Sequence, residues 1–490
     1  MMNGHGQSDG CIVSKKSPNK PEGAEERERR QLAEGNGRQS PILRTQSRGK
    51  RMKETLERIR EAVRRDRKGK LTALYHHVYN IDHLREAYYG LKRNAAAGID
   101  GETWQHYGQN LGENLRDLSE RLGRRAYHAT PVRRVYIPKG DGRQRPLGIP
   151  ALEDKIVQSV TAQILSVIWE EEFLGFSYGF RPGRSPHHGL DALTVGVERK
   201  RVRWVLDADI QEFYDSLSHE WLLRFVEHRI GDRRILALIQ KWLRAGVLED
   251  GTWTQSEEGT PQGGVISSVL ANIYLHYVFD LWAHHWRRSN ARGDMIIVRY
   301  ADDFVVGFEH RAEAERFQEA LKERMSKFDL RLQSDKTRLI EFGRFAAPNR
   351  EKRGEGKPET FTFLGFTYSC GKTRKGKFCV LRQTVQKRMR AKLREVKTEL
   401  KRRMHEPVPD QGKWLRVILL GHYRYYGVPR NSPALGAFRQ EVVMLWRRIL
   451  KKRGQKSKIT WERMNRWVKR WLPYPHICHP YPAIRLCVRT

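Results

Sequence analysis

The chain has little cysteine and no long apolar run. Its 490 residues include five cysteines, an odd and sparse set that favours a reducing cytosol over a disulfide-stabilised scaffold. No stretch of about 18 uncharged apolar residues occurs, which excludes a membrane-spanning helix. Residues 1–10 contain no apolar segment of the kind that a signal peptide requires. We therefore expect a cytoplasmic protein without a membrane partner.

Acidic residues are scarce relative to basic ones. The 93 lysines and arginines outnumber the 57 aspartates and glutamates, which gives a formal charge of +36. An excess of this size points to a polyanionic partner, although a generically basic surface and a ribosomal-type RNA binder are alternatives. Residues 381–490 hold 28 of the basic residues and only six acidic ones, a net charge of +22. Most of the surplus therefore belongs to the last 110 residues.

The distribution of apolar residues divides the chain into five parts. Residues 1–50 are rich in Gly, Ser and charge, so we expect them to be disordered. We expect a helical region over 51–128 and a region of mixed helix and strand over 129–370. A basic helical domain is expected over 380–459, followed by a short basic nucleic-acid-binding segment over 460–490. The fold class that this division predicts is α+β.

Strand signals are confined to the mixed region. A hairpin is expected where β-branched residues precede and follow Gly140-Asp141-Gly142. Short apolar runs bounded by polar residues predict further strands. These predicted strands cover residues 132–137, 145–150, 204–206, 295–299, 304–308 and 361–368.

Three aspartates at the ends of such strands are the residues expected to carry chemistry. Asp302 and Asp303 are adjacent between two apolar runs, and Asp209 follows another. Neighbouring carboxylates repel one another unless a cation sits between them. Mg²⁺ prefers carboxylate and phosphate oxygens, and two such ions can activate a hydroxyl and neutralise a leaving pyrophosphate. A solvated Asp-Asp turn is the alternative for the pair alone.

Several separated motifs resemble those of the reverse transcriptases encoded by bacterial group II introns, which also act as splicing maturases. The resemblance extends from about Leu71 to Pro482. Its motifs are Ile137-Pro138-Lys139 with Arg145–Pro150, Gly175–Gly183, Asp209–Asp215, Gly259–Gly264, Tyr300-Ala301-Asp302-Asp303, Phe363–Phe366 and Gly421–Tyr426.

The resemblance implies a right-hand polymerase with fingers and an antiparallel palm sheet, followed by a helical thumb and maturase domain. Asp209, Asp302 and Asp303, with the carbonyl of Ile210, would bind two Mg²⁺ ions for RNA-directed DNA synthesis from deoxynucleoside triphosphates. The expected nucleotide contacts are Lys139, Arg145, Tyr214, Gln262 and Lys336, of which Tyr214 would exclude a 2′-hydroxyl. The expected template, primer and RNA contacts are Gly263, Gly264, Arg181, Lys387, Arg388, Lys392, Tyr423 and Arg424.

The implied partners are a group II intron RNA, target DNA and an RNA template with a DNA primer, in the bacterial cytosol or nucleoid. The oligomeric state is left open, with one monomer per intron favoured. Many members of the family carry an HNH nuclease with two cysteine pairs. No Cys-x-x-Cys pair occurs here, so we expect neither that nuclease nor a zinc site.

Three alternatives to a mobile intron's reverse transcriptase remain. A domesticated relative, for example one used in defence, would share all of these motifs. An RNA-dependent RNA polymerase is less consistent with Tyr214, which favours deoxynucleotides. A splicing factor with an inactive polymerase site would have no reason to retain all three aspartates.

Overall fold

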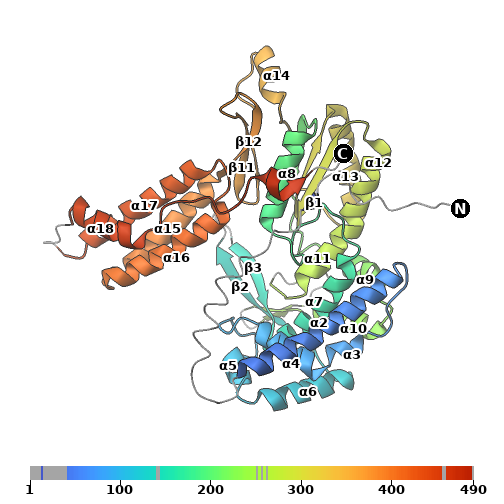
Figure 1. Cartoon of the computed structure of the whole chain (residues 1–490). Coiled ribbons are helices and arrows are strands. Elements are labelled where there is room, and N and C mark those ends of the chain that lie inside the picture. The colour runs from blue at the N-terminus through green and yellow to red at the C-terminus, as the bar shows by residue number, and fades with distance from the viewer. Residues whose placement is uncertain are drawn as a thin grey trace.

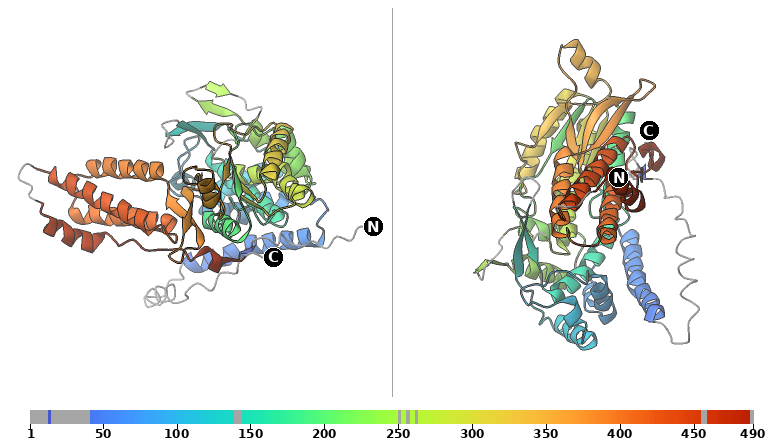
Figure 2. Two further views of the ribbon diagram at one scale, coloured as in Figure 1. Left: turned by 90° about the horizontal axis from the view of Figure 1, so that it is seen from above. Right: turned by 90° about the vertical axis from the view of Figure 1, so that its left-hand side faces the viewer.

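The computed structural model describes residues 13–14, 41–138, 144–249, 252–254, 258–260, 263–454 and 459–487. An α+β body and a projecting bundle of helices make up this part of the chain, as Figures 1 and 2 show. The α+β class predicted from the sequence is confirmed. No helix in the described ranges is long and apolar enough to cross a membrane.

The N-terminal helices pack around the long helix α7 (Leu152–Glu170). Residues on every side of α7 are buried, which marks it as the central helix of the body. The helix α2 begins at Pro41, so the expectation that disorder extends to residue 50 is wrong for its last ten residues. Proline is well tolerated in the first turn of a helix. The helices of this region are α2 (Pro41–Arg65), α3 (Tyr75–Val78), α4 (Ile81–Gly90), α5 (Trp104–Tyr107) and α6 (Leu111–Gly123).

Four antiparallel strands form the central sheet, in the order β7-β8-β4-β9. Their residues are mostly buried because helices cover the sheet, and their apolar runs are therefore continuous. The strands are β4 (Trp204–Ala208), β7 (Met295–Tyr300), β8 (Asp303–Phe308) and β9 (Arg338–Glu341). The covering helices include α8 (Pro186–Arg199), α11 (Ser267–Leu275), the π-helix η1 (His276–Asp280), α12 (Leu281–Asn290) and α13 (Arg311–Ser326).

A second sheet, here called the hairpin sheet, has the strand order β3-β2-β5-β6. Its hairpin β2–β3 matches the prediction, with Ile137 opposite Arg145. The strands are β2 (Val132–Pro138), β3 (Gln144–Ile149), β5 (Val247–Glu249) and β6 (Thr252–Thr254), and the helices α9 (His219–Glu227) and α10 (Arg233–Arg244) precede β5.

A third sheet, the bridging sheet, joins the body to the bundle. The single strand predicted over 361–368 is wrong, because β10 (Phe361–Phe363) and β11 (Phe366–Lys372) form a hairpin with Phe363 opposite Phe366. Leu364 and Gly365 both have positive φ, +47° and +84°, as a tight hairpin turn requires. The third strand, β12 (Phe378–Thr384), pairs with β11, and the short helix α14 (Ala346–Lys352) precedes the sheet.

The basic C-terminal region forms its own helical core. Apolar residues of its helices make a separate cluster around Trp446, which explains why the bundle projects from the body in Figure 2. The helices are α15 (Gln386–Arg402), α16 (Val408–Tyr426), α17 (Ser432–Lys451) and α18 (Trp461–Trp471). After α18 the chain returns to the body as α19 (Pro482–Arg485) and β13 (Leu486–Cys487), which pairs with β1 (Val13–Ser14).

Candidate active site

The two adjacent aspartates lie at the tip of a tight hairpin. The register of β7 and β8 places Tyr300 opposite Asp303, so Ala301 and Asp302 form the turn. Ala301 has a φ of +56°. This left-handed conformation is unfavourable for a residue with a side chain and persists only where the surroundings impose it. The hairpin therefore holds its carboxylates in a defined position.

Asp209 reaches the same edge of the sheet from the neighbouring strand. β4 and β8 are antiparallel, with Ala208 opposite Phe304. Because Asp209 follows Ala208 and Asp303 precedes Phe304, the two aspartates lie next to each other across the strand pair. The structure thus brings Asp209 next to a pair of aspartates that begins 93 residues later in the sequence.

The backbone around Asp209 is fixed by an isolated bridge. The N–H of Gln333 donates to the carbonyl of Asp209 and the N–H of Gln211 donates to the carbonyl of Arg331, each at 2.8 Å. Neither bond uses the carbonyl of Ile210, the residue between them. Its predicted role as a metal ligand remains a prediction.

The carboxylates raise one another's pKa. Burial, together with the charges of Asp302 and Asp209, raises the pKa of Asp303 to about 7. Asp303 has an exposed surface, yet many protein atoms lie around its carboxylate, and their displacement of water is the burial that raises this pKa. Burial and then the charge of Asp209 raise the pKa of Asp302. A divalent cation between the carboxylates would remove this repulsion, so the donor set fits a hard cation with oxygen ligands.

Lys336 is the partner of Asp209 in this structure. Its ammonium group forms an ion pair with Oδ2 of Asp209. Across the described ranges, no group of three or more His, Cys, Asp or Glu side chains is arranged as a finished metal site. The strand pairing makes the aspartates neighbours, but their carboxylates do not converge on one point in this arrangement. Lys336 thus lies at the carboxylates, and its predicted contact with the nucleotide stays a prediction.

A cavity of about 430 Å³ adjoins the aspartates. Asp207, Asp209 and Asp303 line it together with Lys336 and Arg338. Burial raises the pKa of Asp207 to about 6, although Arg338 opposes this shift from 3.7 Å away. Carboxylates and cations side by side suit a phosphate-bearing ligand that arrives with a metal ion.

A fully buried arginine supports the β7–β8 hairpin that carries Asp302 and Asp303, here called the aspartate hairpin. Arg299 and Asp280 both have side chains with 0% exposure and form an ion pair at 2.5 Å. The guanidinium also donates to Oδ1 of Asn272 at 3.0 Å, to Oγ of Ser177 at 2.7 Å and to the carbonyl of Ala301 at 2.9 Å. The last bond holds the strained residue of the turn. The sequence analysis missed this role, although an arginine inside an otherwise apolar strand is a signal of a buried ion pair.

The Gly175–Gly183 loop packs against the same hairpin. The N–H of Tyr178 donates to the carbonyl of Arg299 at 2.8 Å. A Cβ on Gly179 would lie 2.3 Å from the backbone nitrogen of Ala301, so only glycine fits at this position. This close approach explains why the motif accompanies the turn of the aspartate hairpin.

Tyr214 lies near the aspartates. Burial and the charge of Asp302 raise its pKa, whereas the charge of Arg145 lowers it, so both charged groups are within electrostatic reach. The N–H of Thr260 donates to the carbonyl of Tyr214 at 2.7 Å. Gly259 approaches the same carbonyl, with a φ of +80° and no room for a Cβ. The glycine-rich loop therefore fixes Tyr214 beside the carboxylates.

The same loop also contacts the hairpin sheet. Gly263 has a φ of +119°, and a Cβ there would lie 2.8 Å from the carbonyl oxygen of Gly148 in β3. Gly264 follows it at the approach to α11. Lys139 and Gln262 lie outside the described residues, so their predicted nucleotide contacts stay predictions.

Two predicted RNA contacts are wrong. The side chain of Arg181 is 2% exposed and pairs with Glu170 at 2.8 Å, so it braces its own loop. Tyr423 is fully buried and its hydroxyl donates to the carbonyl of Pro473 at 3.1 Å. Both side chains satisfy their hydrogen bonds within the protein and cannot reach RNA.

The other predicted RNA contacts differ in their surroundings. Lys387 and Arg424 are exposed, while Lys392 is ion-paired with Glu395 at 2.8 Å. The charge of Arg388 lowers the pKa of Asp303, which places this side chain on the catalytic side of α15. Arg388 therefore lies within electrostatic reach of the carboxylates, and nucleic-acid binding by all four residues stays a prediction.

Tyr425 of the bundle connects α16 to the bridging sheet. Its hydroxyl donates to the carbonyl of Leu364 at 2.8 Å, in the turn between β10 and β11. Phe363, the residue before that turn, lines the cavity beside Asp209 and Asp303. The tyrosine-rich motif thus positions an element of the active site, which the sequence analysis did not predict.

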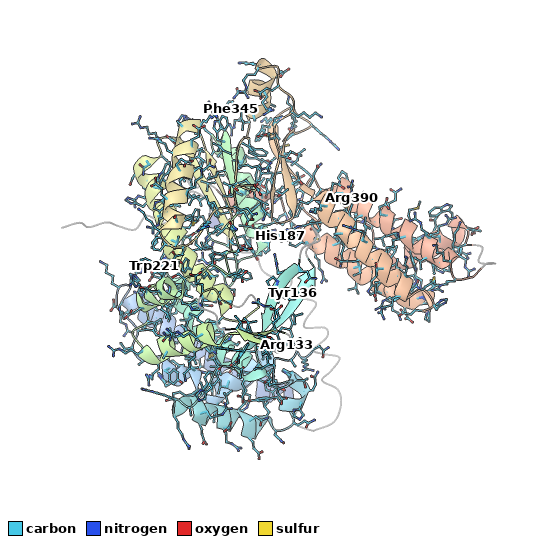
Figure 3. All side chains as sticks on the ribbon, turned by 180° about the vertical axis from the view of Figure 1, so that it is seen from behind. Arg133, Tyr136, His187, Trp221, Phe345 and Arg390 are labelled. Carbon is cyan, nitrogen blue, oxygen red and sulfur yellow. The ribbon has the colours of Figure 1, made fainter. Side chains whose placement is uncertain are left out.

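The described part of residues 460–490 packs against the rest of the chain. Leu486 is 1% exposed, and Arg485 lies 3.3 Å from the buried Asp191 of α8. His479 stacks on His187, with ring centroids 3.6 Å apart, at the junction where Figure 3 labels His187. The prediction of a nucleic-acid-binding segment missed this structural role.

Comparison with known proteins agrees with the geometry. A family model described as reverse transcriptase (RNA-dependent DNA polymerase) matches residues 137–368, which include all three aspartates. The fold and the site therefore define a reverse transcriptase.

Two curated relatives narrow the family. Protein YkfC of Escherichia coli is 36% identical over 274 residues, which cover 49% of this chain and 71% of the relative. The group II intron-encoded protein LtrA of Lactococcus lactis is 36% identical over 225 residues, which cover 45% of this chain and 37% of LtrA. The chain belongs to the family of group II intron reverse transcriptases and maturases.

Proposed function

We propose that this chain is an RNA-directed DNA polymerase that copies RNA into DNA with deoxynucleoside triphosphates and Mg²⁺. We also propose that it acts as a maturase, binding a group II intron RNA to assist splicing and copying that RNA during mobility at a DNA target. The observation that carries the proposal is the meeting of Asp209, Asp302 and Asp303 at one edge of the central sheet. The comparisons favour this over a domesticated relative.

The arrangement of the body supports a right-hand polymerase. In this proposal the central sheet is the palm, the hairpin sheet with the N-terminal helices is the fingers, and the bundle α15–α18 is the thumb and maturase domain. Figure 1 shows the bundle and the hairpin sheet on the same side of the central sheet. A primer and template bound between them would meet Arg388 on one side and Arg145 on the other.

In this proposal, the residues of the site have separate roles in phosphoryl transfer. Two divalent ions held by Asp209, Asp302 and Asp303 would activate the primer hydroxyl and neutralise the leaving pyrophosphate. Arg145 provides a planar guanidinium for the triphosphate. Tyr214, fixed by the glycine-rich loop, occupies the space that a ribonucleotide's 2′-hydroxyl would need. Such catalysis is mainly positioning and charge neutralisation.

Primer extension tests the proposal. The purified chain is expected to extend a DNA primer on an RNA template with Mg²⁺ and deoxynucleotides, and Asp302→Ala is expected to abolish extension. Asp117→Ala, which removes a surface carboxylate from α6, is the matched control and should extend normally. Extension that survives Asp302→Ala would refute the assignment of the metal site.

Splicing of the intron RNA tests the maturase role. Asp302→Ala is expected to leave assisted splicing largely intact, because that role depends on binding rather than on the carboxylates. Loss of both activities in a folded Asp302→Ala protein would refute this separation. The RNA that co-purifies with the chain, sequenced and mapped to the flanks of its gene, would identify the intron.

A further inference from the structure

Two histidines from distant segments meet at the C-terminal end of α16. The last four carbonyls of an α-helix have no partner within the helix, and here side chains from outside supply partners for two of them. Nε2 of His479, in the segment after α18, donates to the carbonyl of Arg424 at 2.7 Å. Nε2 of His187, in α8, donates to the carbonyl of Tyr425 at 2.8 Å. The body and the C-terminal segment therefore cap the same helix end together.

The two imidazoles are stacked and neutral. Their ring centroids lie 3.6 Å apart at an interplanar angle of 15°, and two positive charges at this distance would repel each other. Each Nε2 faces a carbonyl, which only accepts, so the proton of each ring is on Nε2. The guanidinium of Arg485 lies 3.3 Å from Nδ1 of His479. Because a guanidinium can only donate, that ring has no place for a second proton.

The charged groups around the pair also favour the neutral form. Burial lowers the pKa of His187 to about 4, and the charges of Arg485 and Arg382 act in the same direction. Burial lowers the pKa of His479 as well, and Arg485 adds to this shift, while the bond to the helix end and the charge of Asp191 oppose it. Asp191 pairs with Arg382 at 2.6 Å and with Arg485 at 3.3 Å. At neutral pH the two rings are therefore an uncharged contact surrounded by ion-paired groups.

The backbone beside His479 packs closely on the same helix end. The N–H groups of Cys478 and His479 both donate to the carbonyl of Gly427, at 2.8 Å and 3.1 Å. A Cβ on Gly427 would lie 3.0 Å from the backbone nitrogen of Cys478, so a larger residue would have to displace this segment. The position of the C-terminal segment and that of the end of α16 are thus fixed together.

Tyr425 connects this helix end to the candidate active site. His187 contacts it through the hydrogen bond to its carbonyl and through the two rings, whose centroids lie 5.3 Å apart. The hydroxyl of Tyr425 donates to the carbonyl of Leu364 in the β10–β11 turn. Phe363, before that turn, lines the cavity beside Asp209. The end of α16 lies at the junction of bundle and body, where Figure 3 labels His187. A shift of this helix end would therefore move both the bundle and the wall of the cavity.

We propose that His187 and His479 are positioning residues for DNA synthesis, which cap one helix end together and so hold the bundle at the distance from the aspartates that a primer–template requires. The inference rests on the proposed function, since the duplex would lie between the bundle and the hairpin sheet. Neither histidine touches nucleic acid, and both act through α16. Opening of this contact lowers the fraction of chains that can bind a primer–template, and the apparent affinity falls with that fraction.

Steady-state primer extension with His479→Phe and His479→Gln tests the capping role. Phenylalanine keeps a stacked ring but removes the donor, so the KM for primer–template should rise about fivefold. Glutamine keeps an N–H donor and an acceptor oxygen, so its KM should stay within about twofold of the wild type. The KM for deoxynucleotides should change less than about twofold in both variants, because the contact of the incoming nucleotide is not altered. His285→Phe, which replaces an exposed histidine of α12, is the matched control and should extend like the wild type.

The same substitutions at His187 give an independent test, because this residue caps α16 from the body. His187→Phe should raise the KM for primer–template, and His187→Gln should restore it. Hydrogen exchange shows whether only the contact has opened. In His479→Phe the amide of Cys478, which donates to Gly427, should exchange faster. Amides within α17 should stay protected, because the bundle has its own apolar core.

The outcomes distinguish this inference from the proposed function. An unchanged KM for primer–template in both phenylalanine variants, beside a wild-type chain that extends primers, overturns the positioning role alone. Equal impairment by phenylalanine and glutamine also overturns it, because the hydrogen-bond donor would then not matter. Loss of protection throughout α17 overturns it too, since the histidines would then stabilise the fold of the bundle itself. A folded wild-type chain that fails to extend any primer refutes the proposed function instead.

Discussion

The buried pair Arg299–Asp280 allows stability and catalysis to be measured separately. Replacing Arg299 with Met leaves an uncompensated carboxylate at a site with 0% exposure, which costs about 3–5 kcal/mol of folding free energy. The variant also removes the donor to the carbonyl of Ala301. Because a displacement of about 1 Å at a reacting centre costs roughly 100-fold in rate, primer extension should fall by about that factor in the fraction that remains folded.

A second substitution restores only one of the two properties. In Arg299→Met/Asp280→Leu the unpaired charge is gone, so at least about half of the lost stability should return, as apolar replacement of buried ion pairs does elsewhere. The remaining deficit reflects Asn272 and Ser177, which lose their bonds to the guanidinium, at about 1–3 kcal/mol for each unsatisfied group. Extension should stay low because the turn still lacks its support.

Urea denaturation and single-turnover extension measure the two effects. Arg124→Met is the matched control, since Arg124 is 78% exposed and pairs with Glu120 on the surface of α6; its stability should change by less than about 1 kcal/mol. If the double variant recovers stability and full extension together, the guanidinium has no positioning role. If Arg299→Met is as stable as the wild type, the reasoning about the buried pair is wrong.

Three further predictions concern other residues. Tyr214→Ala should admit ribonucleotides, measured as the ratio of kcat/KM for matched nucleotides; an unchanged ratio would exclude a steric role. Tyr425→Phe removes the hydroxyl that donates to the carbonyl of Leu364. This variant should raise the KM for primer–template about fivefold and leave the affinity for intron RNA unchanged. Loss of RNA affinity without a change in this KM would instead show that Tyr425 contacts RNA. Burial lowers the pKa of His276 to about 4, so the unfolded chain binds a proton first as the pH falls. His276 should therefore contribute a loss of about 3 kcal/mol to the free energy of unfolding between pH 6.5 and 4. His276→Leu should flatten this dependence in urea titrations at several pH values, and an equally steep dependence would contradict it.

The aspartate hairpin was predictable because its signals are local. Apolar runs on both sides of Tyr300–Asp303 specify two strands, and the short connection leaves only a tight turn. The hairpin of β10 and β11 was not predicted because its turn has only a weak local signal. Its turn is marked by Gly365 alone, inside a continuous apolar run, and one glycine does not distinguish a turn from a bulge or a close approach.

The roles of individual polar residues were less predictable. Arg181 and Tyr423 resemble RNA contacts in the sequence but are buried and internally bonded. Whether a residue is buried depends on which distant segments pack against it. The pattern of apolar residues in its own segment does not predict that packing. For the same reason, the sequence did not predict that Arg299 donates a hydrogen bond to the carbonyl of Ala301.

The sequence by itself determined the chemistry and the class of fold. Three aspartates at strand ends in a chain of charge +36 predicted a cation and a polyanion as partners, because electrostatic repulsion and attraction depend on which residue types are present. Only the tertiary structure decided how the site is held. Asp209 and Asp303 become neighbours through the pairing of β4 with β8, and Tyr214 is held beside them by hydrogen bonding to the glycine-rich loop. Such placements arise from packing between parts of the chain that are far apart in sequence.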